Sequence, residues 1–252
     1  MWQVIKRSYH QLGSPRYFYR FTSVVLPWLV PAAVLLLVVG LVWGLAFAPP
    51  ERYQGDSYRI IYIHVPASSG AMLGYIAMGV AGFVALVWRM KMAEVALKAL
   101  APFGTVLAAV SLISGSLWGK PTWGTYWQWD GRMTSMLILL FLYLGILALQ
   151  NAIRDPRQAG RAAALLAVVG VIDVVIVKYS VDWLNTLHQG ATLKLVGGSE
   201  IASSMEWPLL ISMLGLWLLY AANVLLRARA EVLRRERRSA WVRRLVVDEE
   251  GH

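Results

Sequence analysis

Six segments of about 20 mostly apolar residues recur along the chain, and each is long enough to cross a membrane as a helix. The expected spans are 24–46, 66–87, 98–118, 133–150, 162–180 and 205–226. A bilayer core offers no water to unpaired backbone groups, so helices, which pair their own, suit such segments. The composition agrees, because 58% of the residues are hydrophobic and only 15% are charged. We therefore predict an all-α polytopic membrane protein, a bundle of six transmembrane helices.

Lysine and arginine are unevenly divided between the two sides of the predicted bundle. One side comprises the leader 1–23, the connections 88–98 and 150–161, and the tail 227–252. These regions hold 18 of the 24 basic residues, against six elsewhere. Because positive charge marks the cytoplasmic side, we expect both termini inside and the loops 47–65, 118–132 and 180–204 outside. The net charge of +10 then reflects topology and attraction to lipid rather than nucleic-acid binding.

Several classes of activity find no support in the sequence. The chain contains no cysteine, which excludes a disulfide framework and a cysteine-ligated metal. The nearest approach to a phosphate-binding loop, GSLWGKP at 115–121, has the wrong spacing and a proline in place of Ser or Thr. Motifs of serine hydrolases and zinc hydrolases are absent as well. We therefore expect neither ATP hydrolysis nor any other enzyme activity from this chain.

Two histidines fall in the predicted outer connections. His64 comes two residues before Pro66, which suits the first turn of the second span, so His64 is expected at the outer mouth of that helix. Apolar residues recur every three or four positions between 177 and 184, which predicts that His188 lies on the apolar face of a helix. A lone histidine at a membrane surface is more often hydrogen-bonded than a ligand. Two on one side favour a ligand pair.

Tryptophan is concentrated in the segment WGKPTWGTYWQWDGR at 118–132. Its candidate binding residues are Trp118, Trp123, Trp127, Trp129, Asp130 and Arg132. An aromatic belt at the lipid headgroups explains scattered tryptophans, but not this density. Such a loop can form a flat apolar platform for a planar ligand, and its glycines let the backbone come close. Asp130 can face the ligand, or it can be the N-cap of the fourth span, and both interpretations can hold together.

A planar, largely apolar ligand that also takes two imidazoles is haem. Iron accepts neutral histidine nitrogens as axial ligands, the porphyrin needs apolar walls, and its propionates need cations at the water edge. Candidate cations are Arg59, Lys120, Arg132 and Lys194. The outer loops therefore predict a haem site outside the bundle core.

The run WGTYWQWDGR at 123–132 resembles the tryptophan-rich "WWD" signature of haem-handling membrane proteins. LNTLHQG, together with the outer histidine before VP, is similar to the haem exporter protein C family of the cytochrome c maturation system. The resemblance covers the six-span core, about 20–226. It implies that haem b is held transiently at the periplasmic face of a bacterial inner membrane, with His64 and His188 as axial ligands and the tryptophans and Asp130 as the platform.

The same resemblance implies partners. Haem would be presented to a periplasmic haem chaperone, which becomes covalently loaded. The other partners are an ATPase subunit, a permease-like membrane subunit and a small single-span subunit, in an ABC-transporter-like complex. Because this chain has no nucleotide motif, any energy input must come from such a subunit.

Two alternatives stay open at this stage: a b-type cytochrome that keeps its haem for electron transfer, and a structural permease subunit without haem. A permanent b-type cytochrome usually buries its haem between helices, whereas both histidines are expected at or beyond helix ends. Two features have no single interpretation. Asp173, inside the fifth span, can be functional or paired with a neighbouring helix. The tail 227–252 can continue the sixth helix or lie on the inner leaflet.

Overall fold

The computed structural model describes residues 13–183, Thr186, His188 and 201–250. Residues 1–12 of the predicted leader lie outside the described residues. So does most of the predicted outer loop 180–204, including the candidate cation Lys194.

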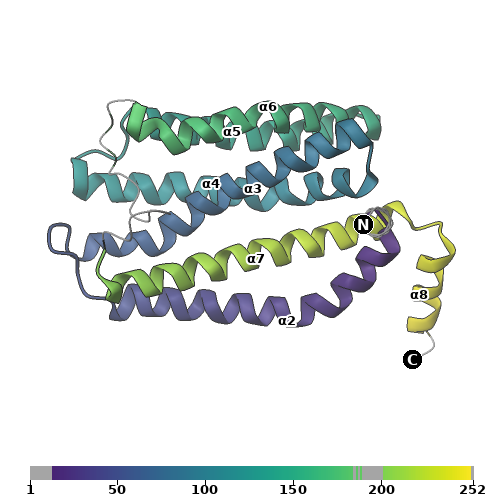
Figure 1. Cartoon of the computed structure of the whole chain (residues 1–252), viewed down its shortest axis with the longest axis horizontal. Coiled ribbons are helices and arrows are strands. Elements are labelled where there is room, and N and C mark those ends of the chain that lie inside the picture. Colours follow the sequence, from purple (N-terminus) through teal and green to yellow (C-terminus); the bar gives the residue numbers. More distant parts are fainter. Residues whose placement is uncertain (1–12, 184–185, 187, 189–200, 251–252) are drawn as a thin grey trace, which may run out of the picture.

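Helices account for every element of the described chain (Figure 1). They are α2 (Pro15–Val42) with the π-helical turn η1 (Trp43–Phe47), the 3-10 turn η2 (Asp56–Ile60), α3 (Ile61–Trp88), α4 (Lys91–Trp123), α5 (Gly131–Ala152), α6 (Pro156–Trp183), α7 (Ser203–Arg235) and α8 (Ala240–Glu250). Six stretches of this part are helical, long and apolar enough to cross a membrane. The predicted all-α fold with six spans is confirmed, and the protein is a multi-pass membrane protein.

The helices extend further than the hydropathy windows predicted. Helix α4 continues to Trp123, so the connection to α5 contains only residues 124–130. Helix α7 runs on to Arg235, which means that the first part of the predicted tail continues the sixth span. Hydropathy detects only the apolar part of a helix, whereas charged and aromatic turns at either end also pair their backbone groups.

The helices pack in pairs, with α3 at the centre. Helix α2 lies along α7, α5 lies along α6, and α3 contacts α4, α6 and α7 (Figure 1). The beginning of α2 and helix α8 are at the right-hand end of the view, and the η1–η2 and α4–α5 connections are at the other end. The candidate site residues of the predicted outer connections therefore collect at the end of the bundle opposite to the beginning of α2.

Three tyrosines fasten neighbouring helices to one another. Each hydroxyl donates to a backbone carbonyl on another helix, Tyr75 to Leu166 (3.2 Å), Tyr143 to Ala71 (2.7 Å) and Tyr220 to Leu100 (2.8 Å). Each ring occupies the space that a side chain would fill at a glycine of an adjacent helix, respectively Gly170, Gly104 and Gly74. Small residues let the helices approach, and the hydroxyl satisfies its hydrogen bond inside the bundle. These contacts fix the positions of the neighbouring helices relative to one another.

Asp173 lies in α6 and is 8% exposed. Its Oδ2 atom makes no hydrogen bond within the described part of the chain. Both interpretations of Asp173 stay predictions.

Candidate functional site

His64 lies in the first turn of α3 and is held by α4. Its Nδ1 atom is 3.0 Å from the backbone oxygen of Ser111 and 3.1 Å from the Oγ of Ser114. A carbonyl oxygen only accepts, so Nδ1 carries the proton and Nε2 of the neutral ring keeps its lone pair. Gly115 leaves room for the ring, because a Cβ there would come within 2.9 Å of the imidazole Cε1.

The structure corrects two predictions about this residue. Helix α3 begins at Ile61, so Pro66 lies in the second turn rather than the first. The reason is that the turn η2 runs directly into α3, so the helical hydrogen bonds begin several residues before Pro66. His64 was also expected at or beyond the helix end, but it lies within the first turn of α3 and is part-buried against α4.

His188 is held by Asp130 from the other side of the site. Its Nδ1 atom is 2.7 Å from Asp130 Oδ2, and the hydroxyl of Thr186 donates to the same oxygen at 2.6 Å. The second carboxylate oxygen, Oδ1, accepts the backbone N–H of Met133 at 2.7 Å and caps α5. The N-cap interpretation of Asp130 is confirmed, and its other oxygen holds His188. The interpretation in which Asp130 faces a ligand stays a prediction.

The prediction that His188 lies on a helix face is wrong. Helix α6 ends its described course at Trp183, and His188 lies in a bend. The local reason is visible in the hydrogen bonds, because the backbone N–H of His188 donates to the Thr186 hydroxyl at 3.0 Å instead of to a helical carbonyl. Side-chain competition of this kind commonly replaces a helical turn.

The pair consists of a carboxylate and a neutral imidazole. Burial alone would raise the pKa of Asp130, but the N–H of Met133, the Thr186 hydroxyl and His188 outweigh it, and the pKa is lowered. Burial lowers the pKa of His188 below its ordinary value, against the opposing effect of the carboxylate. The Nδ1–H therefore donates to Asp130, and Nε2 is left as a basic nitrogen, the arrangement that typically supports a metal-binding histidine.

The four tryptophans do not form one flat platform. Two of them belong to α4 and each touches a histidine: the ring of Trp118 is 5.7 Å from His64 at 74°, and that of Trp123 is 4.6 Å from His188 at 61°. Trp127 and Trp129 form a separate edge-to-face pair at 5.3 Å and 77°. Helix α4 continues beyond its apolar stretch to Trp123. The helix, rather than the loop, therefore orients the rings of Trp118 and Trp123.

Trp129 is the most exposed of these four tryptophans. It is 74% exposed, while the Nε1 atom of Trp127 is buried and has no hydrogen-bond partner in the described part of the chain. Trp118 is fixed differently, since its Nε1 donates to Gln54 Oε1 at 2.7 Å. The loop thus offers an exposed ring, that of Trp129, and a buried indole donor, that of Trp127.

Comparison with known proteins identifies the family. The sequence model of the family described as "Heme exporter protein C" matches residues 8–243 of this chain. The chain belongs to the haem exporter protein C family. It is 47% identical to a haem exporter protein C of Escherichia coli (strain K12), over 98% of both chains. Its identity to the protein of that name from Bradyrhizobium diazoefficiens is 46%, over 90% of this chain and 86% of that one. With the Haemophilus influenzae protein it is 43%, over 94% and 96% respectively.

Membership of this family confirms the resemblance and supports a role in haem handling for cytochrome c maturation. The residues present fit a haem. Two neutral imidazoles, each with Nδ1 engaged and with Nε2 not hydrogen-bonded in the described chain, match the axial ligands of a haem iron. Among the described residues, no group of three His, Cys, Asp or Glu side chains lies close enough together to bind a metal ion without a porphyrin.

Of the candidate cations that the structure describes, Arg132 is the best placed to bind a haem propionate. It lies in the first turn of α5 and interacts electrostatically with Asp130, His64 and His188. The other two described candidates are engaged elsewhere. Lys120 donates to the Gly124 carbonyl at 3.0 Å, and Arg59 donates to the Leu45 carbonyl at 2.7 Å.

Five residues of the site were not identified from sequence: Gln54, Ser111, Ser114, Gly115 and Thr186. Three of them have a recognisable pattern, because Ser111, Ser114 and Gly115 are small residues at i, i+3 and i+4, which line one face of a helix. Gln54 and Thr186 carry no comparable signal.

Proposed function

We propose that this chain binds haem b transiently at the periplasmic face of the bacterial inner membrane, with His64 and His188 as axial ligands. It presents the haem to a periplasmic haem chaperone for covalent loading. It works as a non-enzymatic subunit of an ABC-transporter-like complex, with an ATPase subunit, a permease-like subunit and a small single-span subunit. The observation that carries the proposal is the pair of imidazoles whose Nδ1 atoms are both engaged by the protein.

The two proposed ligands are held by unlike partners. His188 donates to a carboxylate, which makes its Nε2 the more basic nitrogen, whereas His64 faces a carbonyl and a hydroxyl. When bound, haem would supply the iron centre and the vinyl groups that a chaperone can modify. The chain's own contribution is to fix both rings, because Trp118 and Trp123 limit their rotation.

The remaining polar and aromatic groups have roles that follow from their positions. Arg132 supplies positive charge beside both imidazoles, where a propionate needs it. Trp129 is exposed and can lie against an outward edge of the porphyrin, and Trp127 can donate its buried N–H. A haem placed at the end of the bundle, rather than between helices in its centre, is accessible to an acceptor.

Absorption spectroscopy of the purified chain, alone and with an apo-chaperone, tests this proposal. We expect a Soret band typical of bis-histidine haem that is lost from the chain as the chaperone becomes loaded. A haem that stays bound and cycles reversibly between oxidation states would identify a b-type cytochrome instead. A chain that never acquires haem would identify a structural permease subunit.

A further inference from the structure

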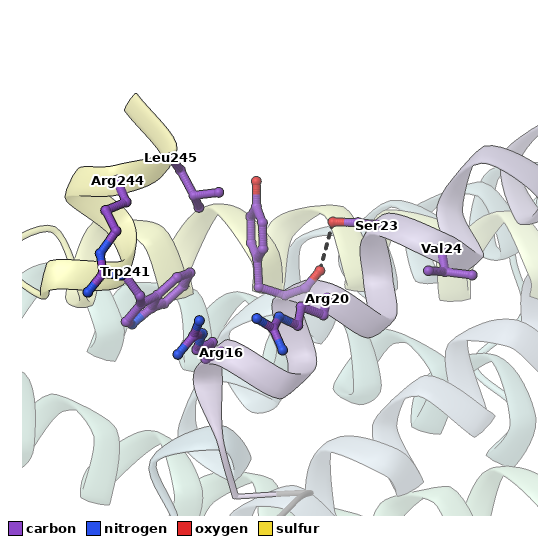
Figure 2. A pocket seen from close by; sticks show the side chains of 8 residues that line it. Arg16, Arg20, Ser23, Val24, Trp241, Arg244 and Leu245 are labelled. Atoms are coloured by element: carbon purple, nitrogen blue, oxygen red, sulfur yellow. Dashed lines mark hydrogen bonds between the residues drawn. The ribbon is translucent and has the colours of Figure 1, made fainter. Parts of the chain in front are cut away.

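A hollow of about 420 Å³ lies between the beginning of α2 and helix α8 (Figure 2). It is at the end of the bundle where α2 begins, opposite to the η1–η2 and α4–α5 connections (Figure 1). The lining residues are Arg16, Tyr19, Arg20, Ser23 and Val24 of α2 and Trp241, Arg244 and Leu245 of α8. Two helices that are distant in sequence thus supply opposite walls.

The wall formed by α8 is anchored to the bundle. Trp241 packs against an apolar cluster of α4 and α7 that includes Val95 and Val232. Its ring is 5.6 Å from that of Tyr19 at 57°. Behind the tyrosine, Arg229 of α7 stacks over the ring at 4.2 Å and donates to the hydroxyl at 2.8 Å. The hollow is therefore a feature of the packed structure.

The hollow concentrates positive charge. Arg16, Arg20 and Arg244 line it, and no lining residue is acidic. None of these three guanidinium groups forms an ion pair with a side chain that the structure describes. By contrast, Arg234 and Arg235 at the end of α7 each bind Glu231 at 2.8 Å. Three guanidinium groups around one concave surface match the oxygens of a phosphate.

An exposed apolar stripe continues from the hollow along α2. Tyr17, Phe21, Val24 and Trp28 recur at spacings of four, three and four residues and are 47–79% exposed. Helix α2 also has the smallest buried share of the six membrane-length helices, 17%. Val24 belongs to both the stripe and the hollow (Figure 2). A ligand that fits both has a phosphate head and extended hydrocarbon chains.

We propose that this hollow binds the headgroup of an anionic phospholipid, with its acyl chains along the exposed face of α2. The surrounding end of the bundle carries most of the Lys and Arg and is predicted to face the cytoplasm, where anionic lipids attract basic clusters. Because the site needs both walls, the lipid ties the C-terminal helix to the first span. This site is independent of the proposed haem site.

Native mass spectrometry of the full chain in detergent tests the proposal, with titration by short-chain phosphatidylglycerol. Micelles of a neutral detergent remove the general attraction of an anionic surface. A basic side chain beside an anionic lipid headgroup generally contributes about fivefold to affinity. The double variant Arg16→Gln/Arg20→Gln is therefore expected to bind about 25-fold more weakly, and Arg244→Gln about fivefold more weakly.

The matched control is Arg154→Gln/Arg161→Gln, which removes the same charge from exposed positions at the same end of the bundle, away from the hollow. We expect its affinity to stay within about twofold of the parent. Phosphatidylcholine and inorganic phosphate serve as competitors. Strong competition by inorganic phosphate would show a free-anion site and overturn the lipid assignment. Equal weakening in the control, or no retained one-to-one lipid adduct in the parent chain, would overturn the proposal as well.

Discussion

The substitution Asp130→Asn separates the two roles of the carboxylate. Asparagine keeps an oxygen that can accept the N–H of Met133, so the cap of α5 survives. The other oxygen becomes an NH₂ group, which cannot accept from His188 or Thr186. The variant therefore removes the support of one proposed axial ligand while leaving the helix start in place.

The magnitude follows from the contacts that are lost. A hydrogen bond to a charged group contributes about 1.5–3 kcal/mol, and removal of the outer partner of a metal-binding histidine typically lowers metal affinity by about 10–100-fold. We expect haem affinity to fall by that factor, which equals about 1.4–2.7 kcal/mol. Asp130→Ala should lose in addition about 1 kcal/mol of folding stability, because the cap disappears too.

The assay is titration of the haem-free chain in detergent, followed by Soret absorbance, with thermal unfolding measured in parallel. Thr186→Ser is the matched control, because serine keeps a hydroxyl that can donate to the same oxygen and accept the N–H of His188, and the carboxylate stays available to His188. Unchanged haem affinity in Asp130→Asn, with an unchanged spectrum, would refute the argument that this carboxylate supports a ligand.

The same titration gives the pH dependence. The pKa values of Asp130 and His188 are both lowered in the folded chain, so the stability they contribute is present at higher pH and is lost as pH falls. For His188 the loss of folding stability begins near its ordinary pKa of 6.5, because the unfolded chain then takes up a proton that the folded chain does not. Protons compete with haem for the folded imidazole only at its lowered pKa. Haem affinity should therefore stay nearly constant to below pH 6.5 and fall at lower pH, and a rise in affinity on acidification would contradict this reasoning.

Three further predictions concern topology, the aromatic group and the core. A reporter that is active only in the cytoplasm should be inactive when fused at residue 125, since the Lys and Arg count predicts that this loop is outside; an active fusion would reverse the predicted topology. Trp123→Phe should retain most haem, because another ring can contact the histidine, whereas Trp123→Ala should lose haem and Trp28→Ala should not; equal losses at both positions would reduce Trp123 to a membrane anchor. Gly104→Ala should destabilise the bundle by about 1–3 kcal/mol, because the added Cβ overlaps the ring of Tyr143; an unchanged melting temperature in detergent would contradict this.

Several errors made from the sequence have a common origin. The predicted helix through His188 rested on apolar spacing, but a threonine hydroxyl took the place of a helical carbonyl. The flat platform rested on the density of tryptophan, but α4 continues far enough to orient Trp118 and Trp123 separately. In both cases a local pattern was overridden by contacts that the pattern does not contain.

The sequence by itself determined the number of spans, the all-α class and the residue types of the candidate site. These depend on local properties: the length of an apolar run must match the bilayer, and the WGTYWQWDGR signature lies within ten consecutive residues. Tertiary structure alone decided how the histidines are held. His64 meets Ser111 across 47 positions of the chain, and His188 meets Asp130 across 58. A hydrogen bond between such distant positions requires that the packed helices bring donor and acceptor within about 3 Å, and no spacing along the chain encodes that distance.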